Sequence, residues 1–145
     1  MRKINHIQIH HSATDNKIFK ANNHIKIWNS FKRFHMKKGW FDIAYHFGIF
    51  PDGKILSGRA IKYKPAGIAF HNTGGIALCM VGNFDKKEPD EIQYTETIKL
   101  TAKLMKEWNI DKIVFHRDFT NRKYCPGLLI NKFDFIKKVY EILEE

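Results

Sequence analysis

Four segments of the chain carry the hydrophobic patterns of β-strands. Residues 4–10 predict a strand with one polar face, because Ile7 and Ile9 alternate with His6, Gln8 and His10. Residues 45–56 form two apolar runs around a Pro51-Asp52-Gly53-Lys54 turn, which predicts a hairpin. Residues 76–81 are continuously apolar, which is typical of a central strand buried on both faces, and residues 113–115 form a short strand.

Three other segments repeat their apolar residues at helical spacing. The first covers about residues 23–38 and ends at Gly39. Its apolar face carries Ile27, Phe31 and Phe34, and we expect this face to pack on the core. The second and third cover residues 98–108 and 136–143. Because strands and helices alternate along the chain, the pattern predicts an α/β fold with a sheet covered by helices.

Length and charge narrow the class of protein. The 145 residues fit one compact domain spanning 1–145, without repeats or a linker. The formal net charge of +10 favours an anionic partner such as nucleic acid, acidic lipid or an anionic bacterial envelope. Residues 1–6 are basic but lack the apolar run of a signal peptide, and no segment is apolar enough to span a membrane. We therefore expect cytoplasmic synthesis without a signal peptide.

Three places put metal-binding side chains at or after the ends of predicted strands. They are His10-His11, His116, and Cys125 nine residues beyond His116. Two imidazoles and one thiolate leave a fourth tetrahedral position for water, which is the layout of a catalytic zinc site. The spacing alone also fits eight scattered histidines that serve as surface or core residues. Strand parity favours His10 over His11, because His10 shares the polar face and His11 follows the apolar one.

Four motifs in order give the chain a resemblance to a known family. They are Ile9-His10-His11-Ser12-Ala13-Thr14, Gly39-Trp40-Phe41-Asp42-Ile43-Ala44-Tyr45-His46-Phe47, Ile76-Ala77-Leu78-Cys79-Met80-Val81-Gly82, and His116-Arg117-Asp118 with Lys123-x-Cys125-Pro126-Gly127. Together they resemble the type 2 N-acetylmuramoyl-L-alanine amidases, which include phage amidases and peptidoglycan recognition proteins. The resemblance covers residues 4–135 and implies a central mixed β-sheet flanked by about three helices.

The resemblance also implies a site and a reaction. It places a zinc ion (Zn²⁺) on His10, His116 and Cys125, and gives catalytic roles to Tyr45 and Lys123. The implied reaction is hydrolysis of the amide between N-acetylmuramic acid and L-alanine in peptidoglycan. One of the two catalytic residues would stabilise the developing oxyanion and the other would relay a proton, and the sequence leaves open which does which.

Three neighbouring residues have weaker interpretations. His46 is expected in the core or behind a ligand, and Cys79 as an inert thiol within an apolar strand. In related proteins a histidine in the loop that corresponds to the region of His71 contacts the substrate. Here that loop is shorter, and His71 comes later in it than the histidine of the relatives. The muropeptide contacts of this loop are therefore left open.

Three alternatives compete with an amidase. A peptidoglycan-binding protein without catalysis is disfavoured, because members that lose activity commonly lack the cysteine that is present here as Cys125. A cysteine hydrolase pairing Cys125 with His116 would leave His10 without a role. A nucleic-acid-binding domain is suggested only by the basic and aromatic residues 31–40, so no nucleic-acid partner is expected.

The biological setting is predicted from the same features. An amidase without a signal peptide or a wall-binding module fits a monomeric phage endolysin that reaches the cell wall after the inner membrane is permeabilised. Its positive charge would hold it on anionic envelope polymers. A secretion-delivered or recycling amidase is the alternative.

Overall fold

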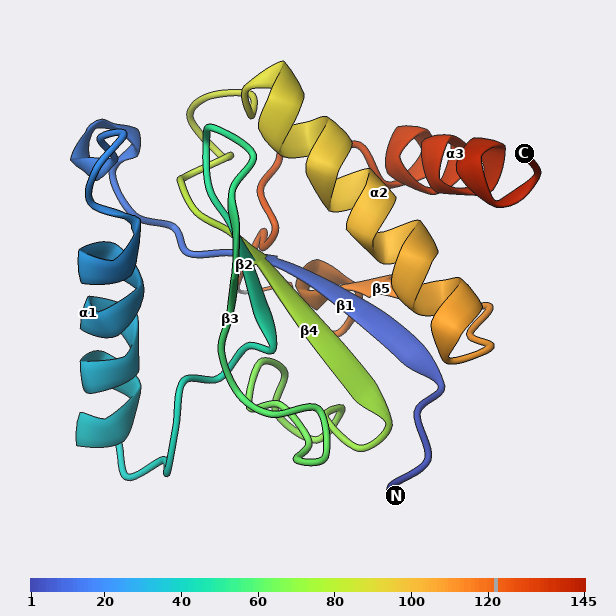
Figure 1. The fold of residues 1–145 in the computed structure, drawn as a ribbon, viewed down its shortest axis with the longest axis horizontal. Coiled ribbons are helices and arrows are strands. Elements are labelled where there is room, and N and C mark those ends of the chain that lie inside the picture. The colour runs from blue at the N-terminus through green and yellow to red at the C-terminus, as the bar shows by residue number, and fades with distance from the viewer. Residues whose placement is uncertain (122) are drawn as a thin grey trace.

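A five-stranded mixed sheet forms the centre of the molecule in the computed structural model, which describes residues 1–121 and 123–145 (Figure 1). The strand order is β3-β2-β4-β1-β5, and β3 alone runs antiparallel to its neighbour. The strands are β1 (His6–His11), β2 (Phe47–Ile49), β3 (Ile55–Ser57), β4 (Gly75–Met80) and β5 (Ile113–Phe115). The predicted hairpin, the buried central strand and the mixed sheet are confirmed.

Three α-helices in the described part of the chain cover the two faces of the sheet. They are α1 (His24–Lys37), α2 (Glu91–Glu107) and α3 (Lys132–Leu143). The helix α1 lies on one side of the sheet, and α2 and α3 lie on the other (Figure 1). None of the described helices is long and apolar enough to cross a membrane.

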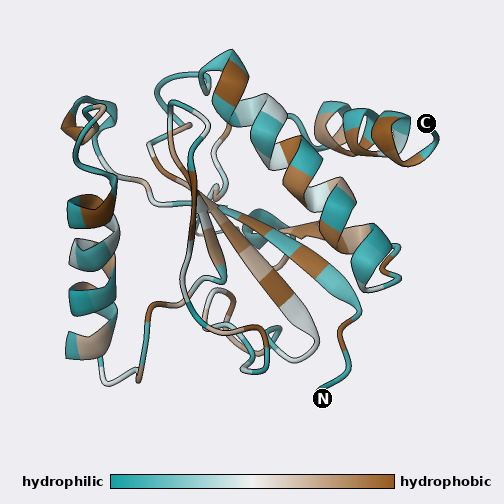
Figure 2. Cartoon of the chain, viewed as in Figure 1, coloured by the Kyte–Doolittle hydropathy of each residue, from teal (hydrophilic) through white to brown (hydrophobic). Residues whose placement is uncertain are grey.

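Alternation along the strands divides the core into two hydrophobic clusters. The larger one packs the isoleucines of β1 and alternate residues of β4 against α2 and α3. The smaller one packs Cys79 and Val81 of the opposite face against Ile27 and Trp28 of α1. Figure 2 shows the resulting hydrophobic and hydrophilic bands along β1. The polar face of β1 is consequently buried too, and its side chains must find hydrogen-bond partners inside the protein.

The structure corrects two details of the predicted elements. Phe34 was expected to pack on the core, but it is 57% exposed. Ile27 and Trp28 occupy the part of α1 that faces the sheet, and Phe34 lies beyond it on the wall of a cavity. Tyr45 was expected on a strand, but β2 begins two residues later, at Phe47. Gly39, with φ of +97°, ends the α1 segment as predicted.

Gly48 of β2 provides a test of the packing between α1 and the sheet. A Cβ there would collide with Cζ3 of Trp28 and lie 2.6 Å from Cη2. The indole is held in place because its N–H donates to the Ser57 carbonyl at 3.0 Å. Because the ring cannot move away cheaply, we expect Gly48→Ala to lower the free energy of unfolding by about 1–3 kcal/mol. Thermal denaturation measures this, and an unchanged Tm would show that the contact is looser.

Candidate metal centre and active-site cavity

Strand pairing brings the first two metal-binding residues together. β1 and β5 are parallel neighbours, and Ile9 of β1 pairs with Phe115 of β5. His10 comes directly after Ile9 and His116 directly after Phe115, so both histidines lie at the same carboxyl edge of the sheet. Their ring centroids lie 5.3 Å apart in an edge-on arrangement. The carboxyl ends of parallel strands are the usual location of binding sites in such sheets.

The loop after β5 adds the third residue, Cys125. Its backbone is held by the His-Arg-Asp motif, since the Arg117 N–H donates to the Cys125 carbonyl at 2.9 Å. The Arg117 guanidinium also donates to the carbonyls of Gly127 and Ile130, both at 2.7 Å. The thiol then lies 3.6 Å from Nδ1 of His10 and accepts the backbone N–H of His11 at 3.3 Å.

The three side chains form a cluster whose geometry fits a zinc ion. One ligand atom from each of His10, His116 and Cys125 lies within 4.8 Å of the other two. His10 and Cys125 are only 1% and 8% exposed, and His116 is partly buried. Two nitrogens and one sulfur are a donor set that zinc prefers, and three protein ligands leave a coordination position open.

Burial sets the protonation of the cluster. It lowers the pKa of His10 well below its usual value, with His116, His11 and Lys123 adding repulsion, so His10 is in the neutral form that binds metals. It raises the pKa of the Cys125 thiol to about 12. A buried thiol of this kind ionises when it ligates a divalent cation, but it is a poor nucleophile alone. This disfavours a cysteine hydrolase.

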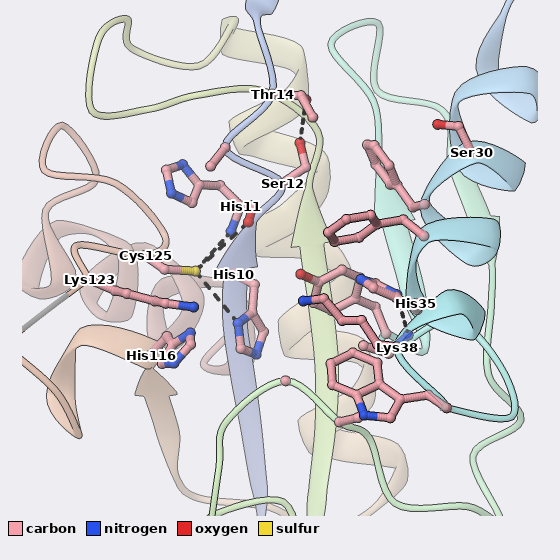
Figure 3. Close-up of a pocket in the computed structure, with 18 of the residues that line it drawn as sticks. His10, His11, Ser12, Thr14, Ser30, His35, Lys38, His116, Lys123 and Cys125 are labelled. Atoms are coloured by element: carbon pink, nitrogen blue, oxygen red, sulfur yellow. Dashed lines mark hydrogen bonds between the residues drawn. The ribbon is translucent and has the colours of Figure 1, made fainter.

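A cavity of about 780 Å³ opens in front of the cluster (Figure 3). One end holds the three candidate ligands, and the opposite wall is formed by the aromatic and basic residues Phe31, Phe34, His35, Lys38 and Trp40. The Lys38 ammonium lies over the rings of Phe34 and Trp40, at 4.7 and 5.2 Å from their centroids. The cavity can therefore hold a ligand that combines apolar and anionic groups.

The two residues expected to be catalytic both line this cavity. The Tyr45 ring lies 5.3 Å from the His10 ring, and burial, followed by the nearby thiols of Cys79 and Cys125, raises its pKa well above the usual value. Tyr45 is thus a neutral hydrogen-bond donor. Lys123 is exposed, and Figure 3 shows its side chain extending toward His116 and Cys125. Burial lowers the pKa of His116, and the charge of Lys123 lowers it further.

The three other histidines considered from the sequence have different surroundings. His11 packs against Phe84 and accepts its backbone N–H at 3.1 Å, as its strand parity predicted. His46 is a core residue, because its two ring nitrogens bond the Tyr63 carbonyl and the Ala77 N–H. His71 is exposed and stacks on Phe119, with centroids 4.0 Å apart; among the described residues it is not one that lines the cavity.

Two buried polar residues of the site were missed by the sequence reasoning. Gln8 was assigned only to the polar face of a strand, but its side chain bonds His10 at 2.9 Å. His35 lay within a helical pattern, but it lines the cavity and accepts the Ala44 N–H at 3.0 Å. The alternation at His6, Gln8 and His10 was a usable signal for Gln8, whereas nothing in the helix pattern singled out His35.

Comparison with known proteins shows which family the chain belongs to. The family model described as N-acetylmuramoyl-L-alanine amidase matches residues 1–128, and the chain therefore belongs to that family. It is 31% identical over 87 residues to the endolysin of Enterobacteria phage K11, covering 60% of this chain and 54% of that one. It is 26% identical over 132 residues to the endolysin of Klebsiella phage KP32, covering 88% and 83%.

Solved structures agree with the sequence relatives. N-acetylmuramoyl-L-alanine amidase LysC from Clostridium intestinale superposes with a TM-score of 0.82 at 27% identity, covering 97% of this chain and 87% of that one. Wild-type Drosophila PGRP-LB superposes with a TM-score of 0.78 at 26% identity, covering 88% and 76%. The α/β fold with a mixed sheet is thus shared with amidases and with peptidoglycan recognition proteins.

Proposed function

We propose that this protein is a zinc-dependent amidase that hydrolyses the bond between N-acetylmuramic acid and L-alanine in peptidoglycan, acting as a phage-type endolysin. Residues 1–145 would form one catalytic domain. The observation that carries the proposal is the cluster of His10, His116 and Cys125 at the carboxyl edge of the sheet, with a large cavity in front of it. The family membership and the endolysin relatives support the same activity.

His10, His116 and Cys125 would hold the zinc ion. When bound, zinc supplies a Lewis acid that lowers the pKa of water and polarises a carbonyl oxygen. The protein would fix the three ligands on two strand ends and on the loop that Arg117 holds by hydrogen bonds, and would leave the side that faces the cavity open. The Lys38 ammonium and the aromatic wall would contact the peptide stem, since a stem peptide has both carboxylates and apolar side chains.

Tyr45 and Lys123 would both act on the scissile amide, Tyr45 as a partly buried neutral group and Lys123 as an exposed cation. Lys123 carries a positive charge on the exposed side of the cluster, where it would stabilise the negative oxygen that develops as the amide is attacked. Tyr45 keeps its proton because of its raised pKa, so its hydroxyl can hold the attacking water by a hydrogen bond and relay a proton toward the leaving amine. Each residue thereby receives the role that suits its charge.

Mass analysis of a digest of purified peptidoglycan tests the reaction. We expect products with new L-alanine amino termini and intact glycan chains, activity lost with a chelator, and activity restored by zinc. Binding without cleavage would instead indicate a recognition protein. Activity that resists the chelator but not a thiol-alkylating reagent would indicate a cysteine hydrolase.

A further inference from the structure

A ladder of buried hydrogen bonds runs along the polar face of β1 and ends at the candidate ligand His10. His6, Gln8 and His10 are 9%, 0% and 1% exposed. Nδ1 of His6 lies 2.8 Å from Oδ1 of Asn5, and Nε2 of His6 lies 3.2 Å from Nε2 of Gln8. Oε1 of Gln8 lies 2.9 Å from Nε2 of His10. The ladder therefore joins the start of the strand to the candidate metal centre.

The directions of these hydrogen bonds follow from one fixed acceptor. The Gln8 amide nitrogen donates to the His71 carbonyl at 3.0 Å, and a carbonyl can only accept. The amide oxygen of Gln8 must therefore face His10, and it too can only accept, so Nε2 of His10 carries the proton. Nδ1 of His10 is left with its lone pair, 3.6 Å from the Cys125 sulfur.

The same logic satisfies the rest of the ladder. The second N–H of the Gln8 amide donates to Nε2 of His6, which leaves the proton of His6 on Nδ1. That proton is donated to the side-chain oxygen Oδ1 of Asn5. Because each donor meets an acceptor in this one arrangement, the ladder has a defined direction from His10 to Asn5.

Two glycines let the backbone close over the ladder. A Cβ on Gly67 would lie 2.5 Å from Nε2 of His10 and 3.0 Å from Oε1 of Gln8. A Cβ on Gly75 would lie 2.7 Å from Nε2 of Gln8. The space around both hydrogen bonds is thus filled by protein, and water is poorly placed to replace Gln8 if its side chain is removed.

We infer that Gln8 is a positioning residue that holds His10 in the Nε2-protonated form and so presents Nδ1 to the metal ion. This inference rests on the proposed zinc site. The partner behind a metal-bound histidine fixes its tautomer and ring orientation, and its loss commonly weakens metal affinity about 10- to 100-fold. Here a neutral amide takes the place of the more usual carboxylate or backbone carbonyl.

Gln93 offers a matched comparison for a merely structural role. It is a second buried glutamine, 1% exposed, and its amide donates to the carbonyls of Ile49 and Val81 at 2.9 Å. Removing either glutamine deletes buried hydrogen bonds and should lower stability. Only Gln8 bonds a candidate ligand, so metal affinity separates the two positions.

The experiment compares Gln8→Leu, Gln8→Glu and Gln93→Leu with the wild-type chain. Zinc affinity is measured by competition with a chromophoric chelator, and the His10 tautomer by long-range ¹H–¹⁵N NMR of the metal-free protein. We expect wild-type His10 to be protonated on Nε2 and Gln8→Leu to bind zinc about 10- to 100-fold more weakly. Gln93→Leu should keep the wild-type affinity, and Gln8→Glu, which retains an acceptor, should bind more tightly than Gln8→Leu.

Two results would overturn the role of Gln8: wild-type zinc affinity in Gln8→Leu, or a wild-type His10 protonated on Nδ1. If Gln8→Leu does not fold, the wild-type tautomer and the affinity of Gln8→Glu decide the question in its place. A wild-type protein that binds no zinc would overturn the proposed function together with this inference. Normal wild-type binding with no effect of Gln8 would overturn the inference alone.

Discussion

Replacing Cys125 with serine is expected to remove zinc binding and amidase activity together. The substitution keeps the shape of a side chain that is 8% exposed and makes it only slightly smaller, so the fold should persist. A serine hydroxyl does not ionise as a cysteine thiol does beside a divalent cation, and only His10 and His116 would remain as ligands. Losing a residue that only hydrogen-bonds a metal ligand weakens zinc affinity by up to about 100-fold, so we expect the loss of a ligand itself to weaken it by more than about 100-fold.

Elemental analysis and muropeptide release measure the two losses on the same preparation. Cys79→Ser is the matched control, because Cys79 is also a buried thiol but lies outside the group of three candidate ligands. It should retain about one zinc per chain. Full lysis by Cys125→Ser would show that the cysteine is not a ligand and that the proposed site is wrong.

The sequence was sufficient for the fold because the core follows simple periodicities. The isoleucines of β1 and alternate residues of β4 pack against α2 and α3, and other residues of the same apolar run pack against α1, so this run is buried on both faces as its pattern predicted. The candidate ligands were a different matter. The spacing of residues 10, 116 and 125 along the chain does not show that their side chains meet. His10 and His116 come together because Ile9 pairs with Phe115 in the folded sheet, and a strand pattern does not predict which strands pair. They were predicted through the order of the family motifs.

The details that were missed depend on neighbours distant in the chain. Phe34 has helical spacing like a core residue, but Ile27 and Trp28 fill the buried side of α1, and Phe34 lies on the cavity wall instead. The role of Gln8 depends on the His71 carbonyl and on the space left by Gly67, which a strand pattern does not encode. Periodicity thus predicted which residues are buried, but not which buried polar groups bond one another.

Replacing Tyr45 with phenylalanine should leave zinc in place and remove most of the turnover. The change deletes one hydroxyl and keeps the ring, which lies 5.3 Å from the His10 ring and 6.5 Å from the Trp28 ring. If the hydroxyl relays a proton, kcat should fall about 10²- to 10⁴-fold, the usual contribution of a positioned acid or base. Zinc content and KM should change little, because neither depends on the proton transfer.

Steady-state kinetics on a defined muropeptide, with zinc analysis of the same sample, measures this split. Tyr94→Phe is the matched control, since Tyr94 lies on α2 and its hydroxyl donates to the Asp134 carboxylate at 2.9 Å. It should keep wild-type kcat. A Tyr45→Phe enzyme with normal kcat would exclude a role for the hydroxyl, and one that lost zinc would show that Tyr45 supports the metal site. A loss confined to kcat means that the hydroxyl interacts with the transition state and not with the bound substrate.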